Sequence, residues 1–63
     1  MSNNIWYAVM TDLDDTDWGT GSYDRAEAVA MVRNNLDIYP DGYIAVIDVS
    51  TNNPVCIDEI HDI

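Results

Sequence analysis

Apolar residues fall into four runs along the chain, and the period changes between them. Ile5 to Thr11 is apolar, aromatic or β-branched at successive positions, which predicts a strand covered on at least one face. Between Ser22 and Leu36 the period becomes helical: one side of the helix carries Ala28, Val29, Val32 and Leu36. Asp24 and Glu27 have capping-box spacing, and Arg33 suits the negative end of the helix dipole. The pattern predicts a helix that starts at Ser22 or Asp24 and runs through Leu36.

The second half of the chain predicts a hairpin. Residues 39–42 (YPDG) are a strong turn signal, and 43–49 (YIAVIDV) reads as a strand rich in β-branched residues. Four residues, 50–53, then connect it to a last strand over 55–60 (VCIDEI), and so short a connection favours antiparallel pairing. The acidic stretch between the first strand and the helix is expected to be a loop, with at most a brief extended stretch around Trp18.

These elements give the order β-α-β-β. The predicted fold is α+β: a small, three-stranded, mainly antiparallel sheet with one helix packed on one face, in two layers. Residues 1–63 form a single small acidic domain. The other face of the sheet is expected to be largely open, and Trp6, Tyr7 or Tyr43 would give it an exposed apolar patch suited to a partner.

The net charge of the chain limits the kinds of partner that it can bind. The chain has twelve carboxylates against two arginines and no lysine, a formal charge of −10 at pH 7. Such a surface neither binds nucleic acid directly nor holds an anionic membrane, and it favours a protein partner with a basic surface. The apolar share of 48% is too high for a disordered acidic tail.

Cysteine usage and the N-terminus predict the compartment. A single cysteine, Cys56, allows no intrachain disulfide and no thiolate zinc cluster. The first residues contain neither a basic region nor an apolar stretch long enough for a signal peptide, and no run approaches a transmembrane span. We expect a soluble, cytoplasmic protein that is complete from Met1.

One string invites an enzymatic interpretation. Residues 9–16 (VMTDLDDT), an apolar strand followed by D-x-D-x-T, resemble the nucleophile motif of haloacid-dehalogenase-type phosphatases. The resemblance implies an attacking Asp12, a proton-handling Asp14 and magnesium. That family also needs a later lysine and a full doubly wound domain, and this chain has neither. Cys56 and His61 lack the orienting group and oxyanion site of a Cys–His pair. We expect no catalytic residue, no cofactor and no enzymatic activity.

The same acids suggest a cation site. Asp12, Asp14, Asp15 and Asp17 supply hard oxygen ligands, but an EF-hand needs glycine at its sixth position and glutamate at its twelfth. Counting from either Asp12 or Asp14, no register satisfies both. No dedicated metal site is expected, and weak, non-selective cation binding stays an alternative. Otherwise the loop is solvated and partly neutralised by Arg25.

The function hypothesis is therefore a non-enzymatic acidic module that binds a basic protein, with mimicry of nucleic acid as its sharpest form. Mimicry predicts acids clustered on one face, whereas an accessory domain that binds through its sheet face predicts scattered acids around an apolar patch. Trp18 either anchors the partner or covers the end of a small core, and the size of the core favours the second. Asp48 lies on the solvated face or opposes an acid across the hairpin. The candidate partner-binding residues are Asp12, Asp14, Asp15, Asp17, Trp18, Asp58, Glu59 and Asp62.

Overall fold

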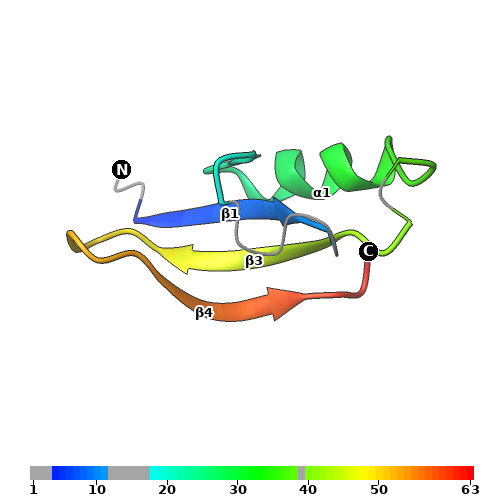
Figure 1. Ribbon diagram of the computed structural model, residues 1–63. Helices are drawn as coiled ribbons and strands as arrows, with labels where there is room; N and C mark the ends of the chain where they lie inside the picture. Colours follow the sequence, from blue (N-terminus) through cyan, green and yellow to red (C-terminus); the bar gives the residue numbers. More distant parts are fainter. Residues whose placement is uncertain (1–3, 12–17, 39) are drawn as a thin grey trace.

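A computed structural model describes residues 4–11, 18–38 and 40–63 and shows one helix on one face of a four-stranded sheet (Figure 1). The elements are β1 (Ile5–Met10), β2 (Gly21–Ser22), α1 (Arg25–Arg33), β3 (Tyr43–Asp48) and β4 (Val55–Ile60). All neighbouring strands are antiparallel, in the order β2-β1-β3-β4. The α+β class predicted from the sequence is confirmed, whereas the count of three strands and the order β-α-β-β are wrong.

The additional strand, β2, has only two residues. It pairs with β1 through Tyr7↔Ser22 and Ala8↔Gly21, and the Val9 N–H donates to the Thr20 carbonyl at 2.7 Å. Two residues cannot show an alternating pattern, so the sequence contains no signal for this strand. It exists because the chain returning to α1 passes close to the free edge of β1.

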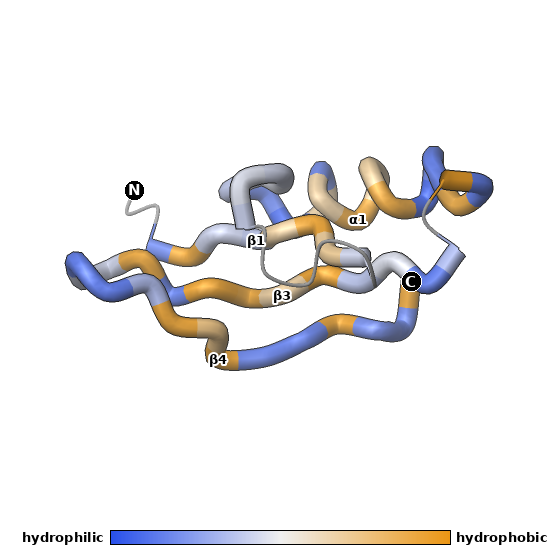
Figure 2. The backbone as a smooth tube through the Cα atoms, in the orientation of Figure 1, coloured by the Kyte–Doolittle hydropathy of each residue, from blue (hydrophilic) through white to orange (hydrophobic). Residues whose placement is uncertain are grey.

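The core on the helix side of the sheet follows the predicted periods. Val9 pairs with Ile44 across β1 and β3, and both pack against Ala28 and Val32 of α1. All four side chains are buried. Ile63, beyond β4, also packs against this cluster and brings the C-terminal segment back toward α1. In Figure 2 the apolar stretches of β1 and β3 lie beneath the apolar side of α1.

The opposite face of the sheet is not open, contrary to the expectation. Its central side chains, Ala8, Met10, Ala45 and Ile47, are at most 2% exposed. They form a second core cluster, against which Trp6, Trp18, Tyr43 and Val49 pack. β1 and β3 are therefore apolar on both faces because both faces are covered. The predicted apolar docking patch does not exist at the centre of this face.

Two tryptophans, Trp6 and Trp18, pack on the covered face and are hydrogen-bonded to each other. The indole Nε1–H of Trp6 donates to the backbone carbonyl of Trp18 at 2.7 Å. The Trp6 ring also meets Tyr23 edge to face, with 4.8 Å between ring centroids and 78° between the planes. Trp18 is half-buried, and it contributes to the core as the size of the domain favours.

The helix begins at Asp24, the second of its two predicted starts, and ends about one turn early. Asp24 is the N-cap, and its carboxylate accepts from the Ala26 N–H at 3.0 Å. The helix stops at Arg33, because Asn34 is the C-cap and the Asn35 side chain donates to the Met31 carbonyl at 2.7 Å. Asparagine favours such local bonds over the helix interior. Leu36, expected on the core side, is 48% exposed.

The β3–β4 hairpin forms as predicted, with an irregularity that shapes β4. The register runs from Ile44↔Ile60 to Asp48↔Val55 and shifts between Val46 and Ile47, which leaves one extra residue, Ile57, in β4. Asp48 therefore opposes Val55 rather than an acid. The backbone of α1 lies close to β1, β2 and β3 but not to β4, so this strand, apart from the half-buried Ile60, is an edge without cover from α1.

Candidate functional site

The predicted partner-binding residues fall into three groups. Asp12, Asp14, Asp15 and Asp17 lie outside the described residues. Trp18 packs against the core, as described above. The remaining three are exposed at the β4 edge of the sheet and just beyond it, and we call them the β4 acidic group: Asp58, Glu59 and Asp62.

The register of β4 places the first two acids on different faces. Asp58 pairs with Val46, which shares the helix-side face of β3 with Ile44, whereas Glu59 pairs with Ala45 of the opposite core cluster. Consecutive strand residues point to opposite sides, so the two carboxylates flank the edge. Asp62 lies at the helix side, where it lines a groove between α1 and β4. A partner that approached the β4 edge would meet negative charge on both sides of it.

Local bonds orient this group. The Asp58 carboxylate accepts from the Glu59 N–H at 2.8 Å, and the Glu59 carboxylate lies 2.9 Å from Nε2 of His61. The His61 ring stacks on Tyr43, with 4.6 Å between centroids and 21° between planes. The His61–Glu59 contact is an ion pair only when His61 is protonated. Tyr43 thus connects the exposed C-terminal segment to the core.

Apolar surface accompanies the acids. Val55 and Ile57 are 53% and 56% exposed, and every residue of β4 except Ile60 is exposed. Figure 2 shows the apolar first half of β4, then a polar stretch, then a short apolar segment at its end. The bulge at Ile57 and the Asp58 carboxylate, which occupies the Glu59 N–H, both hinder the addition of a further strand. The side chains of β4, rather than its backbone, are therefore available to a partner.

Asp48 stabilises the end of the hairpin instead of adding to the acidic group. Its carboxylate accepts from the Ser50 N–H at 2.9 Å. The hydrogen bond from the Ser50 hydroxyl and, to a smaller extent, the bond from the Ser50 backbone N–H hold the pKa of Asp48 below the ordinary value for aspartate. Of the two alternatives for Asp48, a position opposite Asp58 or Glu59 across the hairpin is wrong, because the register pairs Asp48 with Val55.

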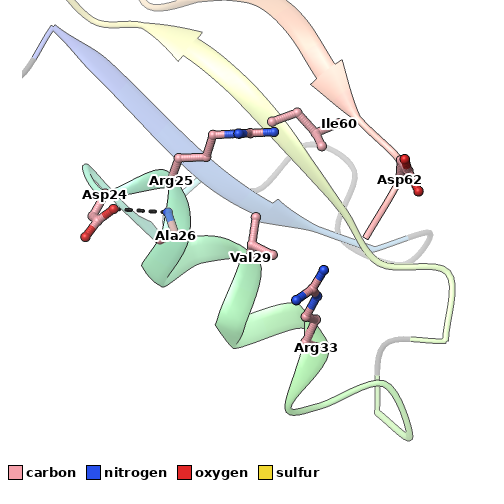
Figure 3. A pocket seen from close by; sticks show the side chains of 7 residues that line it. All are labelled: Asp24, Arg25, Ala26, Val29, Arg33, Ile60 and Asp62. Carbon is pink, nitrogen blue, oxygen red and sulfur yellow. Dashed lines mark hydrogen bonds between the residues drawn. The ribbon is translucent and has the colours of Figure 1, made fainter.

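Both arginines of the chain line the α1–β4 groove, which the sequence analysis did not predict (Figure 3). Arg25 extends across the sheet toward Ile60, and neither Arg25 nor Arg33 forms an ion pair with an acid among the described residues. The prediction that Arg25 partly neutralises the loop acids involves residues 12–17, which lie outside the described residues. The sequence did contain a signal for this: its only two arginines are eight residues apart within the predicted helix.

Three further findings concern metal ligands, the cysteine and the helix. No group of three or more His, Cys, Asp or Glu side chains there is placed to hold a metal ion. Cys56 is exposed, and its thiol lies 3.4 Å from the Asp58 carbonyl. The helix found there is too short to span a membrane.

Comparison with protein-family models, with curated proteins and with solved structures finds no match to this chain. What the protein does is therefore inferred from its own residues and their arrangement. Two surfaces are candidates: the β4 acidic group with its apolar neighbours, and the groove that holds both arginines.

Proposed function

We propose that this protein is a non-enzymatic, cytoplasmic binding module that engages a basic surface on another protein through the β4 acidic group. The observation that supports this most is uncompensated charge. Seven of the eight acidic side chains in the described residues are exposed, and the one ion pair found there is between Glu59 and His61. A module whose charges served only its own stability would pair them within the chain.

Charge and apolar surface have different tasks in this proposal. Individual exposed ion pairs contribute only about 0.2–1 kcal/mol each, so they do not supply the affinity alone. The summed field of a −10 protein raises the rate of encounter with a basic partner by about 10- to 1,000-fold at low salt. Val55 and Ile57, in the first half of β4, supply exposed apolar surface next to these acids, and a protein interface combines apolar and charged contacts.

Nucleic-acid mimicry is the sharpest form of the proposal. A protein that grips a duplex or a single strand presents arginine and lysine side chains to phosphates. The β4 acidic group offers such a groove negative charge on both sides of one strand, from Asp58 and Asp62 on the helix side and from Glu59 on the other side. A basic nucleic-acid-binding protein is therefore the partner we propose. Binding through an open sheet face loses its support, because Ala8, Met10, Ala45 and Ile47 are buried.

The experiment compares two triple variants of equal charge. The first is Asp58→Asn, Glu59→Gln and Asp62→Asn, which removes the charges of the β4 acidic group. The asparagine side chain introduced at position 58 keeps an oxygen that can accept from the backbone N–H of residue 59. The matched control removes three exposed acids elsewhere: Glu27→Gln, Asp37→Asn and Asp41→Asn. The wild type and both triple variants are each used to capture partners from host lysate at low salt. Bound proteins are then eluted with salt or displaced with added DNA. Binding of the purified partner is then measured.

The proposal expects a basic partner that elutes with salt, is displaced by DNA, and binds the control triple variant better than the β4 triple variant. Equal losses in both variants would show that net charge, and not the β4 acidic group, carries the binding. A partner that survives high salt and lacks a basic surface would refute the proposal. Displacement by DNA tests the mimicry separately from the location of the surface.

A further inference from the structure

The α1–β4 groove has the features of a second binding site. It encloses about 490 Å³ and is open along one side. Val29 of α1 and Ile60 of β4 provide its apolar surface, and Arg25 and Arg33 lie toward its two ends. The groove exists because the backbone of α1 lies over β1, β2 and β3 and stops short of β4.

Its charges are available to a ligand. Arg25 and Arg33 are exposed and form no ion pair with an acid in the described residues. Two acids also line the groove, Asp24 and Asp62. The Asp24 carboxylate is bound to the Ala26 N–H at 3.0 Å and points away from both guanidinium groups (Figure 3). Asp62 lies on the β4 side, beyond Ile60. Within the described chain, both guanidinium groups are therefore open to carboxylates of a ligand, which arginine binds through paired hydrogen bonds.

The shape favours an extended peptide over a small metabolite. A small-molecule pocket covers most of its ligand, and a groove open along one side does not. Arg25 and Arg33 are eight residues apart in α1, which is about 12 Å along the axis. An extended chain covers this distance in about four residues at about 3.3 Å each, and residues i, i+2 and i+4 point the same way.

We propose that the α1–β4 groove binds an extended acidic peptide segment of the pattern acidic–x–apolar–x–acidic. The two carboxylates pair with Arg25 and Arg33, and the central apolar side chain packs on Val29 and Ile60. This site goes beyond the proposed function, since it lies on a different surface and requires a ligand of opposite charge. A second copy of this chain is disfavoured as occupant because its own −10 charge repels the first copy.

The test titrates isotope-labelled protein with acetyl-Glu-Ser-Leu-Ser-Glu-amide and follows backbone amide shifts by NMR. The peptide controls are the same sequence with both Glu replaced by Gln, and inorganic phosphate at equal concentration. The protein variants are Arg25→Gln and Arg33→Gln. Asn53→Asp is their matched control, because it brings the net charge to the same value at an exposed position remote in sequence from the groove. Circular dichroism verifies that each variant is folded.

We expect shifts around Val29 and Ile60, and a weakening of at least about fivefold in each arginine variant, since each loses a charge-assisted hydrogen bond. Asn53→Asp should bind as the wild type does. Binding should persist or strengthen up to about 0.15 M salt, because screening reduces the overall repulsion. Binding of a basic partner to the β4 acidic group has the opposite salt dependence, so either proposal can fail without the other.

Several results would overturn the inference. One is the absence of shifts when the peptide is added to the wild type, and another is shifts confined to a different surface. The others are binding of the Gln peptide as tight as that of the Glu peptide, or binding of the Glu peptide by both arginine variants as tight as by the wild type. The same shifts with inorganic phosphate would show a simple anion site and exclude peptide selectivity.

Discussion

The substitution Gly21→Ala tests the closest backbone approach in the fold. A Cβ atom at residue 21 would lie 2.1 Å from the Tyr7 carbonyl oxygen and 2.9 Å from the Ala8 Cα. Both are backbone atoms of β1, so no rotamer change relieves the contact. The methyl group therefore fits only if β2 moves away from β1 by about 1 Å, which lengthens the 2.7 Å bond between the Val9 N–H and the Thr20 carbonyl.

The expected loss follows from the cost of overpacking. Inserting a methyl group into a closely packed site destabilises by about 1–3 kcal/mol. Alanine also restricts the unfolded chain, which acts in the opposite direction by about 0.4–1 kcal/mol. A domain of this size has a total stability of about 3–9 kcal/mol, so a loss of about 1–3 kcal/mol is a large fraction of it. The melting temperature should fall by about 4–8 °C per kcal/mol lost.

The assay is thermal and urea unfolding of Gly21→Ala, followed by circular dichroism. Thr20→Ala, at the neighbouring exposed position, is the control and should change stability by no more than about 0.5 kcal/mol. If Gly21→Ala melts at or above the wild-type temperature, β2 does not approach β1 as the structure shows. The four-stranded sheet would then be wrong at this edge.

Three further predictions concern charge and the covered face. Raising salt from about 10 to about 150 mM should raise the melting temperature, because the screening length falls from about 30 to about 8 Å and weakens repulsion in a −10 chain; an unchanged or lower value in calorimetry contradicts this. Asp48→Ala should destabilise the protein at neutral pH. Since the folded-state pKa of Asp48 is lowered, its contribution is present above the unfolded pKa of about 3.9 and is lost as pH falls through the folded value. The difference between variant and wild type in urea unfolding should therefore shrink on acidification, and a constant difference argues against the role of the Ser50 bonds. Trp6→Phe should cost about 0.5–1.5 kcal/mol through loss of the bond to the Trp18 carbonyl. Trp18 is then the only tryptophan, so its fluorescence should shift to the red, and an unshifted spectrum would show that this bond does not hold it against the core.

Most of the local structure could be predicted from the chain itself. The helix start at Asp24 and the strand over residues 55–60 match the structure, and the other two predicted strands extend one residue too far. These features depend on turn chemistry, capping and apolar period, which act over a few neighbouring residues. The end of the helix was missed because the bond from the Asn35 side chain to the Met31 carbonyl outweighs the apolar signal of Leu36.

The candidate sites were harder to predict. Asp58, Glu59 and Asp62 were identified as exposed acids, but their placement on the two sides of the β4 edge depends on the hairpin register and its bulge. A shift of one residue reverses the face of every side chain in a strand, and the pattern of β4 does not fix its register. The α1–β4 groove depends on where the helix crosses the sheet, which no local pattern encodes.

The sequence by itself thus determined the α+β class, the order of its long elements, the capped helix and the strongly negative charge. Only the tertiary structure decided that β2 joins the sheet, that tryptophans cover the second face, and that both arginines line one groove. The physical reason is range. Caps, turns and periods are set by residues close together in the chain, whereas register, face coverage and groove formation come from packing between segments that only the folded chain brings together.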